Sequence, residues 1–160
     1  MREILFRGIP KIEPTYQFFS DIWKKQCKNG WVYGSLIIAK DKYYICISAL
    51  CRVNSFVDNG ITSMVEVIPE SVGEYTGLKD SYGKKIFEGD IVRTWDDVKG
   101  QIIYGPHIDD EQNADCQGWY WKGIDENDNI LTLSLSDYWE CHKIIGNIHD
   151  NPELMRGEEV

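Results

Sequence analysis

The side chains best suited to chemistry are carboxylates in the second half of the sequence. Asp109, Asp110 and Glu111 follow one another directly. Carboxylates that share a site could bind a metal ion or act as a general acid, because they shift each other's pKa. Consecutive loop side chains usually point apart into solvent, and no helical or strand spacing directs these three toward one point. The pattern therefore favours a solvated acidic loop, within a long exposed connection expected from His107 to Asp115.

A second group of oxygen-bearing side chains resembles part of a calcium-binding loop. Asp125, Asn127 and Asn129 stand at the first, third and fifth positions of that pattern. The rest of the pattern is absent, because Ile130 occupies the place of the glycine that makes the sharp turn and Ser136 the place of the bidentate glutamate. We therefore expect a hairpin loop between two strands here.

Motifs for phosphate binding and nucleophilic catalysis are incomplete. Gly83-Lys84-Lys85 fails the phosphate-loop template, since the position five before Gly83 is Leu78 and no Ser or Thr follows Lys84. No serine stands in a Gly-x-Ser-x-Gly context. The three histidines are isolated along the chain: His107, His142 and His149. We expect neither an enzyme nor a bound cofactor, because an active site would need residues that only folding brings together.

The cysteines predict neither a disulfide framework nor a zinc site. Their number is odd and no Cys-x-x-Cys pair occurs. A metal site would have to draw on residues whose spacing is not that of metal ligands: Cys116, Cys141, His142 or His107. We expect reduced thiols and no metal.

Aromatic residues are the most promising binding groups. Alternation along a strand would send Trp119 and Trp121 to one face and Tyr120 to the other, so not all of them can be core residues. Together with Tyr138 and Trp139 they could form a groove for an extended peptide. The alternative, which we favour, is that they are large core side chains.

Composition and charge restrict the function classes. The chain has 160 residues and a net charge of −9, and aromatic residues make up 12% of it. Residues 1–64 contain nine Lys and Arg against five Asp and Glu, whereas residues 65–160 contain eight against twenty-one. An acidic chain is repelled by phosphate backbones, so general nucleic-acid binding is disfavoured unless the basic half forms a patch. Halves of opposite charge could also attract one another within the chain or between copies, and the second case would favour a homo-oligomer.

No run of about eighteen apolar residues and no signal-peptide pattern is found, so we expect a cytoplasmic protein without a membrane span.

A helix is predicted over residues 15–28 of the basic half. Phe19 and Trp23 lie four residues apart on one apolar face, Thr15 can cap the start, and Asn29-Gly30 supplies the stop. The helix could pack on the N-terminal sheet or bind a partner through Phe19 and Trp23.

Most of the remaining sequence reads as short strands. The N-terminal runs are Glu3 to Gly8, Trp31 to Ala39, Lys42 to Leu50 and Ser63 to Ile68. Gly73 to Gly89 is rich in glycine and turn-forming residues and predicts a structured loop. Five runs follow: Asp90 to Trp95, Gly100 to Tyr104, Gly118 to Ile124, Ile130 to Leu135 and Lys143 to His149. That order is typical of an SH3-like barrel.

The segment IPESVGEYTGLKDSYGKKIFEGDIV (Ile68 to Val92) closely resembles the central motif of the YopX-like proteins of bacteriophages and prophages. Flanking blocks agree with it in the family's order: MREILFRG (Met1 to Gly8), WVYGSLI (Trp31 to Ile37) and IIGNIHDNPELM (Ile144 to Met155). Ile9 to Asn29 and Ala49 to Thr62 look longer than expected of the family. The resemblance implies a two-part, β-rich fold with an SH3-like C-terminal barrel, a phage origin and no established biochemical activity.

Together these observations predict a mainly β protein. Residues 1–68 would form a β-rich subdomain with the inserted helix, residues 69–150 an SH3-like barrel and residues 151–160 a tail. The function we expect is that of a phage accessory protein without enzymatic activity, which binds a host or phage protein partner and self-assembles. The alternative is nucleic-acid or nucleotide binding through the basic N-terminal half, with Lys24, Lys25, Lys28 and Arg52.

Overall fold

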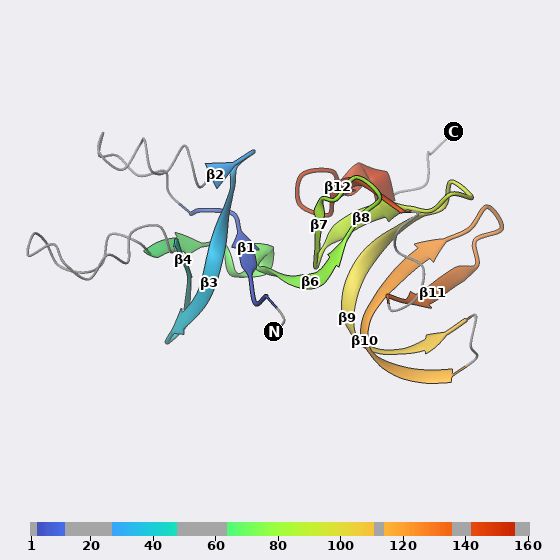
Figure 1. Ribbon diagram of the computed structural model, residues 1–160, viewed down its shortest axis with the longest axis horizontal. Coiled ribbons are helices and arrows are strands. Elements are labelled where there is room, and N and C mark those ends of the chain that lie inside the picture. Colours follow the sequence, from blue (N-terminus) through green and yellow to red (C-terminus); the bar gives the residue numbers. More distant parts are fainter. Residues whose placement is uncertain (1–2, 12–26, 48–63, 111–113, 136–141, 156–160) are drawn as a thin grey trace, which may run out of the picture. The chain divides into compact units, whose positions relative to one another are not determined.

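The structure, a computed structural model, describes residues 3–11, 27–47, 64–110, 114–135 and 142–155 (Figure 1). Within them the chain is mainly β, with two short 3-10 helices. Its contacts divide it into two compact units, Met1–Glu74 and Tyr75–Val160. None of the described helices is long and apolar enough to cross a membrane.

The first unit is an antiparallel sheet. Its elements are β1 (Phe6–Gly8), β2 (Cys27–Lys28), β3 (Trp31–Ala39), β4 (Lys42–Cys46), β5 (Met64–Val67) and the 3-10 helix η2 (Pro69–Ser71). The strand order is β5-β4-β3-β1, and β2 pairs with the start of β3. Four fully or almost fully buried residues form the core: Val32, Ile45, Ile47 and Val67. Branched side chains at alternate positions thus cover one face of the sheet.

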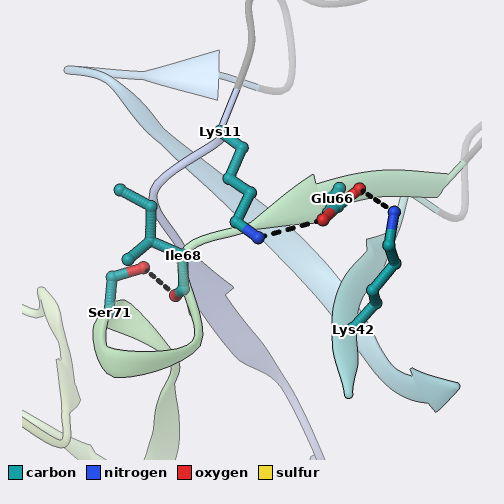
Figure 2. A network of polar contacts seen from close by, with 5 residues as sticks. All are labelled: Lys11, Lys42, Glu66, Ile68 and Ser71. Atoms are coloured by element: carbon teal, nitrogen blue, oxygen red, sulfur yellow. Dashed lines mark hydrogen bonds and ion pairs between the residues drawn. The ribbon is translucent and has the colours of Figure 1, made fainter. Parts of the chain in front are cut away.

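The segment after β1 closes this sheet on β5. Pro10 forms a bridge with Val67, and the Lys11 backbone N–H donates to the carbonyl of Glu66. The Glu66 carboxylate accepts from Lys11 Nζ at 3.0 Å and from Lys42 Nζ at 3.2 Å (Figure 2). The paired lysines lower the pKa of Glu66, chiefly through the hydrogen bond from Lys11. A single carboxylate therefore ties two segments of the unit together.

The second unit contains the longer strands. Its elements are β6 (Gly73–Lys79), which begins in the first unit and pairs there with β1, followed by β7 (Lys85–Phe87), β8 (Asp90–Arg93), β9 (Lys99–Asp109), β10 (Ala114–Ile124), β11 (Ile130–Ser134), β12 (Lys143–Asn147) and the 3-10 helix η4 (Pro152–Met155). A five-stranded antiparallel sheet has the order β11-β10-β9-β8-β12. Strands β9 and β10 are strongly curved (Figure 1).

Trp121 is the centre of the second core. It is 1% exposed, and its indole Nε1 donates to the Val92 carbonyl at 3.0 Å. Gly100 and Gly123 are opposite each other on β9 and β10, and a Cβ on either would lie within 2.3 Å of the indole ring. Because any side chain at these two positions would collide with the ring, the indole packs directly against the backbone of two glycines.

Several predicted elements differ from the structure. Residues 73–89 are not one loop, because β6 and β7 pair there as a hairpin. The exposed loop expected from His107 to Asp115 is wrong at both ends, where β9 runs to Asp109 and β10 starts at Ala114. In each case local turn chemistry was visible in the sequence, and cross-strand pairing was not.

Only the last two residues of the predicted inserted helix, Cys27 and Lys28, are among the described residues. Residues 12–26 are outside the described part of the chain, but Cys27 and Lys28 form β2, so a helix cannot extend to Lys28 as predicted. The predicted division after residue 68 stays a prediction, and the contacts separate the units between Glu74 and Tyr75.

Candidate functional site

The aromatic residues predicted to bind a partner do not gather into one described surface. Trp121 is buried in the core, so its side chain is not accessible to a partner. Trp119 is half-buried against the same core and meets Tyr104 edge-on at 4.9 Å between ring centroids. The four other predicted residues are outside the described part of the chain: Phe19, Trp23, Tyr138 and Trp139.

The carboxylates of the 68–92 segment hold turns. Asp80 accepts hydrogen bonds from the backbone N–H groups of Tyr82, Lys84 and Ile144. Asp90 is 1% exposed and accepts from the Phe87 N–H at 2.8 Å. Buried backbone donors need such acceptors, because an unsatisfied one costs about 1–3 kcal/mol. Both aspartates of the segment therefore have a structural role and are already engaged.

Part of the acidic run at the end of β9 also has a structural role. Asp109 is 3% exposed and accepts from the Ser134 N–H at 2.7 Å, and the Asp110 backbone N–H donates to the Thr132 carbonyl at 2.9 Å. Glu111 is outside the described residues. The solvated acidic loop expected here is thus wrong for Asp109, which fastens the end of β9 to β11.

Folding brings His107 to Ser134, a pairing that the sequence did not indicate. His107 Nε2 is 2.7 Å from Ser134 Oγ, Nδ1 is 3.3 Å from the Gly105 carbonyl, and the ring stacks on Tyr120 at 4.4 Å. The distance would suit a nucleophile and its base. However, Asp109 occupies the Ser134 N–H, so that group is not available to an oxyanion. We interpret the pair as a clamp between β9 and β11.

The loop between β10 and β11 is a tight hairpin, as predicted. Asp125 Oδ1 accepts from the N–H groups of Asn127 and Asn129, each at 2.8 Å, and Oδ2 accepts from Asn129 Nδ2 at 2.9 Å. The Asn129 side chain, followed by the backbone N–H groups, lowers the pKa of Asp125. Asp128 has a φ of +63°, a left-handed conformation that Asp tolerates better than most residues. The loop is thus fixed by Asp125 and presents its other acids outward.

The loop between β8 and β9 is built in a similar way. The Thr94 N–H donates to the Val98 carbonyl, and Asp97, with a φ of +66°, pairs with Arg93 at 3.1 Å. Trp95 in the same loop is 71% exposed. This loop therefore combines exposed acids with an exposed aromatic ring.

The 3-10 helix η4 is placed by the residues before it. Asn147 is 8% exposed, and its Oδ1 accepts from the N–H groups of His149 and Asp150, each at 2.9 Å. A Cβ at Gly146 would lie 2.5 Å from Asn151 Oδ1 and 2.9 Å from Leu154 Cδ1. The glycine therefore allows η4 to pack closely against β12.

These three elements surround a hollow of about 640 Å³, within the size range of ligand pockets. We call it the acidic groove. Four apolar side chains line it: Val98, Ile124, Leu154 and Met155. Five carboxylates and one lysine also line it: Asp96, Asp97, Asp125, Glu126, Asp128 and Lys99. The groove thus combines apolar contact area with a strong excess of negative charge.

Much of this negative charge has no compensating partner in the part of the chain that the structure describes. Among the described residues, Asp96, Glu126 and Asp128 make no ion pair. No group of three or more His, Cys, Asp or Glu within the described ranges is arranged to hold a metal ion. The acids are therefore spread around the groove and do not converge on one point. Such an arrangement suits several cationic groups better than a single small ion.

Sequence reasoning missed the groove because its residues come from segments 96–99, 124–128 and 154–155. The available signal was the excess of acids in the second half of the chain. Sequence alone could not indicate which acids remain free of internal partners.

Residues 22–156 match a family model described as YopX protein. The search of curated proteins returned no match.

Proposed function

The chain belongs to the YopX family, and on this premise we propose that it is a phage- or prophage-encoded accessory protein that binds another protein in the host cytoplasm without enzymatic activity. The observation that carries the proposal is the acidic groove, where apolar side chains lie beside three carboxylates, Asp96, Glu126 and Asp128, that pair with no other described residue. By contrast, Asp80 and Asp90 of the 68–92 segment accept hydrogen bonds from backbone N–H groups.

The proposal includes the finer architecture. The second unit would be an SH3-like barrel, supported by its antiparallel order β11-β10-β9-β8-β12 and by the contacts from Asp109 and Asp110 to β11. The inserted segment would form a helix that ends before β2. Self-assembly stays part of the proposal, because the two halves of the sequence are opposite in charge.

A site-specific crosslinking experiment tests the binding function. A photo-crosslinking amino acid placed at Ile124, inside the groove, should capture a protein partner in host cells. The matched control is the same amino acid at Tyr82, which is 75% exposed and does not line the groove. Capture from position 124 alone, lost on neutralising the groove acids, is the expected result. Equal capture from both positions, or none from position 124, would contradict the proposal.

A further inference from the structure

The chemistry of the acidic groove restricts what can occupy it. Resting on the proposed binding function, we infer that the groove takes a short peptide segment of a partner protein in which Lys or Arg residues flank apolar side chains. Three features of the groove point to this occupant: its lining, the persistence of its charge and the backbone that presents its acids.

The lining demands both an apolar and a cationic component. Val98, Ile124, Leu154 and Met155 offer apolar surface that gains from contact with apolar side chains. Ile124 is 49% exposed although it lines the groove. A free metal ion or a small polycation would leave this surface in water. A purely apolar peptide would have to bring its surface next to five carboxylates without compensating them.

The negative charge of the groove persists at neutral pH. Asp125 has a lowered pKa, caused mainly by its hydrogen bond from Asn129, so it stays ionised. Among the described residues Lys99 is the one cationic side chain that lines the groove, and Arg93 outside it pairs with Asp97. Anionic ligands such as nucleotides would therefore be repelled at short range. A cationic segment is attracted from a distance and gains its ion pairs at contact.

The loop backbones hold the acids outward before any partner binds. Asp97 and Asp128 have left-handed φ values of +66° and +63° at the tips of their loops. Both loops are closed by hydrogen bonds within the loop, from Thr94 to Val98 and from Asp125 to Asn129. A partner would therefore meet acids that are already in position, which lowers the entropic cost of binding.

The test measures fluorescence anisotropy of short labelled peptides against the full chain. The probe alternates lysine with leucine, and two control peptides alternate glutamate with leucine and lysine with serine. We expect the lysine and leucine peptide to bind most tightly and to weaken as salt is raised. The variant D96N/E126Q/D128N should bind it about tenfold more weakly, the effect of a few exposed charge pairs. Asn at position 128 preserves the left-handed backbone preference.

A charge-matched variant controls for long-range electrostatics. D41N/E70Q/D115N removes the same number of exposed carboxylates, none of which lines the groove, and should bind as the wild type does. Ile124→Thr should weaken the lysine and leucine peptide but not the lysine and serine peptide. Thermal denaturation checks that each variant is folded.

Several results would overturn the inference. Equal weakening by both triple variants would place the interaction outside the groove, and preferred binding of the glutamate peptide would reverse the assigned charge. That second result would contradict the cationic segment but would leave the proposed binding function of the groove intact. Absence of binding by all three peptides would refute the cationic segment, whereas the crosslink at position 124 decides the binding function separately. Self-association that only D96N/E126Q/D128N abolishes, without peptide binding, would identify a second copy as the occupant.

Discussion

Asp90 lies at the start of strand β8 and Asp96 shortly after its end, and one side chain is buried whereas the other is exposed. Asp90 starts the strand, is 1% exposed and accepts a hydrogen bond from the Phe87 N–H. Asp96 follows the end of the strand, is exposed and lines the acidic groove without an ion pair to another described residue. Side chains of one chemical type therefore stabilise the fold at one end of a strand and are available to a partner at the other.

The same contrast extends to the two units. Glu66 in the first unit is held between two lysines, whereas Glu126 in the second unit faces solvent at the groove. A carboxylate with internal partners contributes to stability, and one without them costs electrostatic repulsion that a cationic partner would relieve. The position of the carboxylates that have no partner among the described residues is thus the feature of this molecule that says most about function.

The largest expected effect separates two tryptophans. Trp121→Ala should lower the free energy of unfolding by about 3–5 kcal/mol, because it empties a packed core site and removes the bond to Val92. Trp95→Ala should change it by less than about 0.5 kcal/mol, since that side chain is 71% exposed. Urea denaturation of both variants measures the difference, and similar losses would contradict the assignment of core and surface.

A smaller effect separates the two aspartates of the comparison. Asp90→Ala should cost about 1–3 kcal/mol, because the Phe87 N–H is left without this acceptor in a buried turn. Asp96→Ala should leave stability within about 0.5 kcal/mol of the wild type. The same denaturation experiment serves here. A loss at Asp96 as large as that at Asp90 would show that the groove acids are structural.

The pH dependence of stability should report on Glu66. Its pKa is lowered in the folded protein, so its contribution is fully present above the pKa of an unfolded glutamate, about 4.3. The contribution disappears as the pH falls through the lowered pKa. Glu66→Gln should therefore lower the melting temperature slightly at pH 7 and make no difference in strong acid. A difference that persists or grows in acid would show that the pairing with Lys11 and Lys42 is not its source.

The smallest effect concerns the tip of the β10–β11 loop. Asp128→Gly should leave stability unchanged or raise it by less than about 1 kcal/mol, because glycine adopts the φ of +63° without strain. Asp128→Asn should be neutral. Melting temperatures of the two variants measure this, and a marked loss in either would mean that the Asp128 side chain makes a stabilising contact.

Much of the strand content could be predicted from the sequence, and the way distant segments meet could not. Trp31–Ala39 was predicted with its observed bounds, since a run rich in strand-forming residues lies there between turn signals. The exposed loop after His107 was wrong because the acids of that run suggested solvent, whereas Asp109 is buried against β11. Acidic residues are normally exposed, and only cross-strand partners reverse that expectation.

The candidate site was predicted less well than the fold. Trp119 and Trp121 were expected to share a face, and the structure packs both against one core. That a large ring would be fully buried depends on Gly100 and Gly123 beneath it, and their pairing is set by the register of β9 on β10. The groove likewise depends on two loops and η4 meeting. The sequence lists the residues of such sites, but it does not indicate which residues become neighbours in the folded chain.

The most direct test of the central claim is an NMR titration of the isotope-labelled chain with the lysine and leucine peptide. Binding in the groove predicts that backbone amide shifts change mainly in residues 96–99, 124–128 and 154–155. Little change is expected around Glu66 and Asp90. Shifts concentrated elsewhere, or none at saturating peptide, would contradict the claim that the uncompensated acids of the second unit form a docking site.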